Sequence, residues 1–164
     1  SIAMNTSSIL RLSRDAQRRI SQSCPYKLRV FRSGIHRLGV RAAQNIPAGR
    51  KVIEYAGEKI SRAETRRRFL HGSPGRSRKQ NYLARLDVYW TIDGAAGGSG
   101  AELINHTCDP NLRLKNFRGR LWLFSLRRIR PGEELGYDYQ FAKNGERVIC
   151  RCGSPKCRGT INCT

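Results

Sequence analysis

Three cysteines crowded near the C-terminus constrain this chain more than any other feature. Cys150, Cys152 and Cys157 form a C-x-C-x4-C pattern, and Gly153 and Pro155 between them allow the tight turn that would aim the thiols at one point. Because a disulfide imposes strict geometry on each pair, cysteines this close together suit a metal better. We therefore expect a zinc site and a reducing compartment.

The fourth ligand of a tetrahedral zinc is not singled out by spacing. The side chains that could complete the site are Cys24, His106, Cys108 and Cys163, of which Cys163 is the nearest in sequence. A framework of disulfides is the alternative use of six cysteines. A chain of 164 residues without an apolar leader makes that alternative less attractive.

The charge is strongly unbalanced. A formal net charge of +20 suggests a polyanionic partner, most often nucleic acid, although a solvated basic surface would give the same composition. The basic residues concentrate in residues 11–37, 62–79 and 113–130, and the last of these stretches contains no acid. No apolar run approaches the roughly 18 residues of a membrane helix, so we expect no membrane span.

Six short apolar runs bounded by turn signals predict a compact, mostly β assembly rather than alternating strands and helices. In the fifth run Leu112 and Leu114 alternate with Arg113 and Lys115, which predicts one buried face and one cationic, solvated face. The six runs are Lys27–Arg32, Leu38–Ala43, Lys51–Tyr55, Asn81–Asp87, Asn111–Phe117 and Arg120–Leu126.

One helix is marked by its ends. Ser61 followed by Glu64 is a capping box, and no helix breaker occurs before Gly72, so the pattern predicts a helix that ends at His71. Residues 72–79 and 94–100 are rich in small residues and are expected to be flexible. The first 26 residues are Ser- and Arg-rich and are expected to form an arm with a single helical turn.

Two further clusters contain side chains that could take part in a reaction. Asn105–Asn111 gathers an amide, an imidazole and a thiol, and Gly132–Tyr139 ends in Tyr-Asp-Tyr, whose alternation places two phenols on one face and the acid on the other. Pro-Gly turns at 46–49 and 129–132 open strands that end in tyrosines, which would let those tyrosines converge. Taken alone, each cluster is better explained by an ordinary turn or by ordinary packing.

Together and in this order, these segments resemble a SET domain with a post-SET tail, and most of all the trithorax-type histone methyltransferases. The resemblance runs from about Lys27 to Asn162. It rests on the segments Ser33–Gly39, Val52–Glu58, Asn81–Asp87, Ile92-Asp93, Glu102–Asn111, Glu134–Tyr139 and Cys150–Cys157.

The resemblance implies an architecture and a metal site. It implies an N-terminal arm at 1–26, a SET domain of several small sheets around a C-terminal pseudoknot at 27–141, and a post-SET zinc-binding tail at 142–164. It also implies that Cys108 completes the site, so that the zinc ligands are Cys108, Cys150, Cys152 and Cys157.

An activity is implied as well, namely transfer of a methyl group from S-adenosylmethionine to a protein lysine. Tyr139 would orient the reacting groups, with Tyr137 and Tyr55 lining the site, and a tyrosine at 137 would favour mono- or dimethylation. The residues implied to bind the cofactor are His36, Arg37, Leu38, Gly39, Tyr82, Asn105, His106 and Arg151.

This sequence departs from the family pattern at three positions. Arg37 stands where the family has glycine, Ser99 where it has asparagine, and Glu102 where it has arginine. Because these positions border the implied cofactor site, a catalytically silent SET module that binds nucleic acid or a partner protein is the alternative function. A small zinc-stapled DNA-binding protein is a third possibility, but it would leave the tyrosines and the Asn-His pair without a role.

The implied partners follow from the same resemblance. The substrate would be a histone-like tail or another chromatin protein. The charge adds a second partner: a protein of net charge +20 should repel a free basic tail, so we expect contact with DNA or a nucleosome to offset that repulsion. We expect a monomer. The location would be the nucleus in a eukaryote. In a bacterium it would be the cytoplasm, or a host nucleus after delivery.

Overall fold

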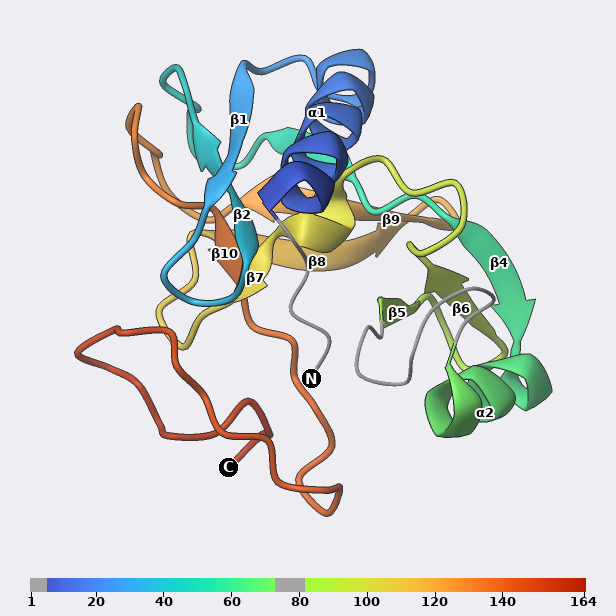
Figure 1. Ribbon diagram of the computed structural model, residues 1–164. Coiled ribbons are helices and arrows are strands. Elements are labelled where there is room, and N and C mark those ends of the chain that lie inside the picture. Colours follow the sequence, from blue (N-terminus) through green and yellow to red (C-terminus); the bar gives the residue numbers. More distant parts are fainter. Residues whose placement is uncertain (1–5, 73–81) are drawn as a thin grey trace.

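The computed structural model describes residues 6–72 and 82–164, and within them it is mostly β, as predicted (Figure 1). No helix in these described ranges is long and apolar enough to cross a membrane. The elements in chain order are α1 Thr6–Ser23, β1 Leu28–Arg32, β2 Leu38–Ala42, β3 Lys51–Glu54, β4 Glu58–Ser61, α2 Arg62–His71, β5 Leu83–Arg85, β6 Trp90–Asp93, the 3₁₀ helix η1 Ala101–Leu103, β7 Asn105–His106, β8 Leu112–Phe117, β9 Arg120–Ser125 and β10 Gly136–Tyr137.

Helix α1 is far longer than the single turn expected near the N-terminus, and that expectation was wrong. Ala16 and Ile20, four residues apart on one helical face, are both about 1% exposed. Gln17 beside them donates its amide to the Leu28 carbonyl at 2.9 Å and accepts the Val30 N–H at 2.9 Å. The helix is therefore fixed by tertiary contacts to β1, which a Ser- and Arg-rich composition does not reveal.

Each of the six predicted runs contains a strand, although β5 begins at Leu83 and Asn81 lies outside the described residues. The main sheet has the order β3-β9-β8-β10-β7, and β10 lies parallel to both of its neighbours. Strands β1 and β2 form one small sheet, and β4, β6 and β5 form another. Because β10 lies between β8 and β7, the Tyr-Asp-Tyr segment comes beside the Asn-His strand β7.

Helix α2 confirms the predicted capping signal. The Ser61 side chain accepts the Glu64 N–H at 3.3 Å, and the helix ends before Gly72. The flexible loop expected at 72–79 falls almost entirely on residues outside the described ranges.

The second segment expected to be flexible, residues 94–100, is a turn whose tip at Ala96 and Gly97 is exposed and whose two ends pack into the protein. Gly98, Ser99 and Gly100 are buried. A Cβ atom on Gly98 would lie 2.3 Å from the Gly94 carbonyl oxygen, and one on Gly100 would lie 2.3 Å from the Ile20 side chain. Gly98 is thus required by the close approach of the turn to its own backbone, and Gly100 by the close approach of the turn to α1.

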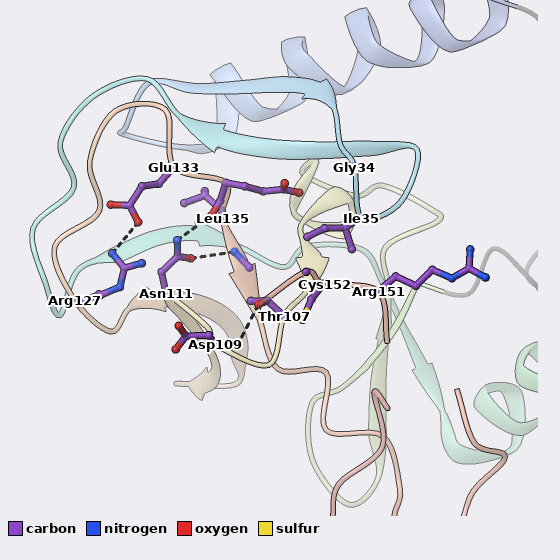
Figure 2. Close-up of a pocket in the computed structure, with 13 residues that line it drawn as sticks. Gly34, Ile35, Thr107, Asp109, Asn111, Arg127, Glu133, Leu135, Arg151 and Cys152 are labelled. Carbon is purple, nitrogen blue, oxygen red and sulfur yellow. Dashed lines mark hydrogen bonds and ion pairs between the residues drawn. The ribbon is translucent and has the colours of Figure 1, made fainter. Parts of the chain in front are cut away.

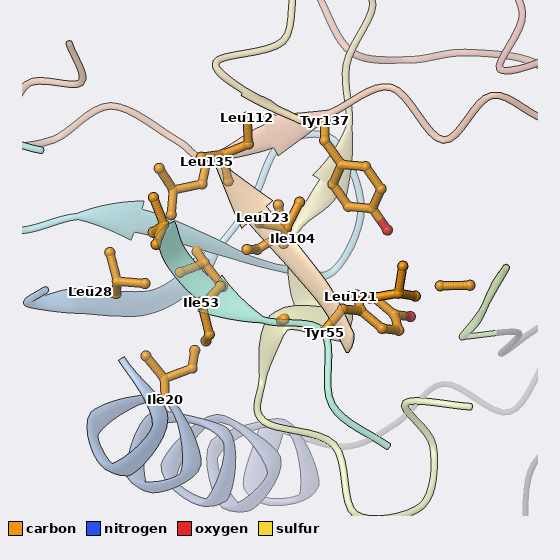
Figure 3. Close-up of a cluster of buried hydrophobic side chains, with 14 of the residues drawn as sticks. Ile20, Leu28, Ile53, Tyr55, Ile104, Leu112, Leu121, Leu123, Leu135 and Tyr137 are labelled. Atoms are coloured by element: carbon orange, nitrogen blue, oxygen red, sulfur yellow. The ribbon is translucent and has the colours of Figure 1, made fainter. Parts of the chain in front are cut away.

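The core joins the two Pro-Gly turns and the tyrosine-bearing strands. Ile46 and Ile129 are fully buried and exchange two backbone hydrogen bonds of 2.9 Å. The strands that follow these turns reach the same side of the hydrophobic cluster, where the rings of Tyr55 and Tyr137 extend in the same direction (Figure 3). The hydrogen bonds between the two turns therefore fix the positions of the strands that follow them.

Candidate active site and metal centre

Three tyrosines meet at the edge of the core. The rings of Tyr137 and Tyr139 are 4.8 Å apart between centroids, and the Tyr139 hydroxyl donates to the Ile104 carbonyl at 2.8 Å. The Tyr55 hydroxyl donates to the Tyr82 carbonyl at 2.8 Å. Both hydroxyls are therefore held by backbone acceptors from segments that are distant in sequence.

Burial keeps these phenols neutral. Desolvation raises the pKa of Tyr55, Tyr137 and Tyr139 above the ordinary value, and the nearness of Tyr137 and Tyr139 raises the pKa of Tyr55 further. A neutral phenol at physiological pH donates a hydrogen bond but does not remove a proton. This cluster can position a polar group in an apolar environment, and it cannot act as a general base.

Strand β7 supplies the amide and imidazole of the second cluster. The Asn105 side chain donates to the Leu38 carbonyl and to Glu134 Oε1, each at 3.1 Å. His106 Nδ1 accepts the Tyr139 N–H at 3.2 Å, so we assign its proton to Nε2. Burial lowers the pKa of His106 despite the nearby Asp138 carboxylate, which agrees with a neutral ring.

The acid of the Tyr-Asp-Tyr segment faces away from the phenols, as the alternation predicted. The Arg158 guanidinium donates to both Asp138 oxygens, at 2.7 and 2.8 Å. Burial would raise the pKa of Asp138, but the hydrogen bonds from Arg158 outweigh it and the pKa lies below its ordinary value. Because Arg158 follows Cys157 directly, this pair joins the cysteine-rich tail to the tyrosine strand.

Four thiols lie close enough to share one metal ion. The sulfur atoms of Cys108, Cys150, Cys152 and Cys157 are all within 4.8 Å of one another, and Cys108 and Cys150 are 3.7 Å apart. A tetrahedral zinc with Zn–S bonds of about 2.3 Å separates its sulfurs by about 3.8 Å. The donor set and its spacing both suit zinc, and this cluster includes the distant Cys108 rather than the neighbouring Cys163.

The other two cysteines lie elsewhere. Cys163 is exposed, and Cys24 donates to the Val52 carbonyl at 2.9 Å. Burial raises the pKa of Cys24 to about 11, so its thiol stays protonated and is a poor metal ligand.

A cleft of about 540 Å³ separates the loop before β2, the start of β10 and the cysteine tail (Figure 2). Arg151 is the one implied cofactor residue among those that line it, whereas Ile35 and Thr107 on its wall are the chain neighbours of His36 and His106. The lining residues are Gly34, Ile35, Thr107, Asp109, Asn111, Arg127, Glu133, Glu134, Leu135, Gly136, Arg151, Cys152 and Gly153.

The loop that carries the implied cofactor residues has a constrained backbone. Arg37 has φ +38°, a left-handed conformation that favours glycine, which is the residue the family pattern has here. A Cβ atom on Gly39 would lie 2.5 Å from Glu134 Oε1 and 2.9 Å from Ser33 Cβ, so a side chain here would displace the Glu134 carboxylate and crowd Ser33. Glu134 in turn accepts a hydrogen bond of 2.8 Å from Ser33 and holds the loop.

One residue beside the site was not predicted from the sequence. Arg19 of α1 donates to Glu102 Oε1 at 2.5 Å and to the Gly98 carbonyl at 2.6 Å. Glu102 thus pairs with a guanidinium from α1, at the position where the family pattern has an arginine. No local signal could have found this pair, because its members are 83 residues apart and α1 itself was not expected.

The family of this chain follows from its similarity to known proteins. Residues 37–140, well over half of the chain, match the family model described as the SET domain. The chain belongs to the SET-domain family. The resemblance drawn from the motifs is thereby confirmed, and the relatives include proteins of the trithorax type.

This SET domain is similar to histone-lysine methyltransferases of several eukaryotes. It is 41% identical over 138 residues to the histone-lysine N-methyltransferase trithorax of Drosophila virilis, covering 81% of this chain and 4% of that protein. It is 41% identical over 141 residues to the H3 lysine-4 specific enzyme of Saccharomyces cerevisiae, covering 80% and 13%. The histone H3-lysine(4) N-trimethyltransferase of Arabidopsis thaliana is 37% identical over 167 residues, covering 98% and 16%.

The fold of this SET domain agrees with a solved structure. The crystal structure of KRYPTONITE in complex with mCHG DNA and SAH superimposes with a TM-score of 0.69 at 30% identity, over 84% of this chain and 29% of that one. The chain therefore spans only a small part of the length of these relatives. The predicted SET fold is confirmed, and the four-cysteine cluster at its C-terminal end could hold zinc.

Proposed function

We propose that this chain is an S-adenosylmethionine-dependent protein-lysine N-methyltransferase that acts on a histone-like tail or another chromatin protein. The single observation that carries the proposal is the cluster of neutral tyrosines in a SET domain, in which the Tyr139 hydroxyl is held by the Ile104 carbonyl immediately before the Asn-His strand. The relatives named as histone-lysine methyltransferases support it, as does the SAH-bound structural neighbour.

The tyrosine cluster suits the chemical demand of lysine methylation. Only the neutral amine has a free electron pair, and deprotonating a lysine of pKa about 10.4 at pH 7 costs about 4–5 kcal/mol. An apolar, phenol-lined site lowers that cost because it desolvates the ammonium form. We assign to Tyr139 the alignment of the reacting amine, and to Tyr137 and Tyr55 the walls of the channel.

The cofactor would supply the electrophilic methyl group. The cleft has the volume of a small-molecule site, and it borders the loop before β2, the end of β7 and the tail. We propose that these segments hold the cofactor, largely through backbone groups. The residues assigned to this role are His36, Arg37, Leu38, Gly39, Tyr82, Asn105, His106 and Arg151.

We further propose that zinc joins the tail at 142–164 to the SET domain at 27–141. Cys108 lies two residues after His106, whose imidazole accepts the Tyr139 N–H. A metal held by Cys108, Cys150, Cys152 and Cys157 would fix the tail against the segment that carries the Asn-His pair. The tail would then close the site only when the metal is bound.

Tyr137 bears on the degree of methylation. Its hydroxyl narrows the channel beside Tyr139, which favours mono- or dimethylation by this chain. The Arabidopsis relative is named as a trimethyltransferase, so the degree varies within the family. Tyr137→Phe is expected to shift the products toward trimethyllysine, as read by mass spectrometry of a methylated peptide. An unchanged product distribution would remove Tyr137 from this role.

The relatives also bear on location. Histone methylation by the eukaryotic relatives implies the nucleus for a eukaryotic source. A bacterial source would place the protein in its own cytoplasm or, after delivery, in a host nucleus.

The decisive experiment measures transfer of a labelled methyl group to core histones, nucleosomes and a basic nucleoid protein in parallel. We expect transfer by the wild type and a loss of about 100-fold or more in Tyr139→Phe, because alignment supplies several kcal/mol. A catalytically silent module, favoured by Arg37 and Glu102, would show no transfer and no thermal stabilisation by saturating S-adenosylhomocysteine. Activity that survives in Tyr139→Phe would contradict the assigned role.

A further inference from the structure

The β8–β9 hairpin has one face that the proposed function does not use. Its register pairs Arg113 with Phe124, Lys115 with Trp122 and Phe117 with Arg120, and residues paired in this way lie on the same side of the sheet. The opposite side holds the buried Leu112, Leu121 and Leu123. We call the outer side the cation-aromatic face. It consists of Lys51, Arg113, Lys115, Phe117, Arg118, Arg120, Trp122 and Phe124.

The aromatic rings of this face hold cations in place. Lys51 Nζ lies 3.7 Å from the centroid of Phe117 and 5.0 Å from that of Trp122. The guanidinium of Arg118 lies 5.4 Å from the Phe117 centroid, and that of Arg120 lies 5.8 Å from the Trp122 centroid. These contacts orient charged groups that would otherwise be mobile, so less entropy is lost when an anion binds.

The face is also poor in acid. It offers five basic side chains, and among residues 6–72 and 82–164 Glu54 is the one acid that pairs with a cation of this face, through Arg120. Arg113, Lys115 and Arg118 are exposed. A dense row of oriented cations on an open sheet surface is complementary to a polyanion.

We propose that the cation-aromatic face binds the phosphate backbone of double-stranded DNA. The contacts favour a duplex over a single strand, because cations already cover the ring faces on which unpaired bases would stack. The inference deepens the proposed function and in that sense rests on it. A protein of net charge +20 repels a free basic tail, and DNA held on this face would offset that repulsion on chromatin.

The test variant removes three charges without disturbing the core. Arg113→Gln and Lys115→Gln change exposed side chains of β8. Arg118 and Gly119 form the hairpin turn with φ +53° and +77°, and asparagine tolerates this conformation, so Arg118→Asn removes the charge and keeps the turn. The matched control removes three exposed charges elsewhere, through Arg11→Gln, Arg14→Gln and Lys143→Gln.

Binding to a labelled duplex of about 20 base pairs is measured by fluorescence anisotropy between about 50 and 200 mM salt. Each lost phosphate contact lowers the salt slope by about 0.9, so the face variant should lose about 2–3 in slope and about tenfold or more in affinity. The control should stay near the wild type, because its three charges are not part of the cation-aromatic face. Wild-type and face-variant thermal unfolding should coincide.

Three results would overturn the proposal. These are an equal loss in the face and control variants, tighter binding to the single strand than to the duplex, and binding to phosphatidylserine vesicles without binding to the duplex. Methyl transfer to a free tail peptide is measured separately. Duplex binding without transfer would contradict only the proposed function, whereas transfer without duplex binding would contradict only this inference.

Discussion

Arg158 connects the cysteine-rich tail to the tyrosine strand through its two hydrogen bonds to Asp138. Both side chains are about a quarter exposed, so solvent screens the pair only in part. Arg158→Gln should therefore lower the free energy of unfolding by about 1–2 kcal/mol. It should also slow methyl transfer, because Asp138, which stands between Tyr137 and Tyr139, loses the guanidinium that holds its carboxylate in place.

Arg158→Lys is the informative comparison for this pair. A lysine keeps the charge but cannot make both hydrogen bonds, so we expect it to recover part of the stability and less of the transfer rate. Denaturant unfolding and initial rates on one peptide measure the two effects. If lysine restored the rate fully, the geometry of the pair would be irrelevant and only its charge would matter.

The buried phenols predict how stability depends on alkaline pH. The folded chain holds the pKa of Tyr55, Tyr137 and Tyr139 above 10, whereas the unfolded chain ionises them near 10. Stability from these groups is complete below pH 10 and is lost as pH rises above it. Part of the tyrosinate absorbance should then appear only together with unfolding seen by circular dichroism. Tyr137→Phe should remove about a third of that delayed part.

At the scale of elements, α1 is tied to the segment that leads into the active site. Glu102 is nearly buried and Arg19 is one-third exposed, and two residues after Glu102 the Ile104 carbonyl accepts the Tyr139 hydroxyl. Arg19→Ala leaves the nearly buried Glu102 carboxylate with the hydrogen bond from the Gly100 N–H but without its guanidinium partner, so we expect a loss of about 1–2 kcal/mol. Arg19→Ala combined with Glu102→Gln should recover part of the loss, because no charge is then left unpaired.

Arg18→Ala is the matched control on the same helix. Arg18 pairs with Asp15 at 3.0 Å, but its side chain is 69% exposed, so its removal should change the stability by less than about 0.5 kcal/mol. Urea unfolding of the four proteins, wild type included, measures all of these differences. Equal losses in Arg18→Ala and Arg19→Ala would show that the contact with Glu102 stabilises the fold no more than an exposed ion pair does.

The helices and strands differ in how much of the sequence pattern that predicts them lies within the element itself. The hairpin β8–β9 and helix α2 were predictable, because the alternation of apolar residues and the capping pattern each involve only a few adjacent residues. Strands β7 and β10 have two residues each and exist only because β10 pairs with a distant strand on either side. Helix α1 and the packed Gly94–Gly100 turn depend on each other, through Ile20 and Gly100, so neither is visible in its own sequence.

At the scale of the molecule, the site was predictable in its parts and not in its assembly. The spacing of Cys150, Cys152 and Cys157 indicated a metal, but proximity in sequence favoured Cys163 as the fourth ligand. The resemblance to the family indicated Cys108, and the fold brings that thiol to the other three because β10 and the tail return to the end of β7. Sequence distance says little about such a partner, whereas chain topology decides it.

That topology sets an expectation for metal removal. Without zinc, the tail keeps the β-bridge between Ile149 and Thr160 and the hydrogen bonds from Arg158 to Asp138. It loses the link to Cys108 that the metal would provide. Chelation should therefore loosen residues 142–164 and leave β8 and β9 protected, as a local rather than global opening measured by amide hydrogen exchange. Cys108→Ser should reproduce the loosening and lower the zinc content, and Cys163→Ser should do neither. Zinc loss in Cys163→Ser equal to that in Cys108→Ser would show that the fourth ligand lies in the tail itself, and that the metal does not hold the tail against the active site.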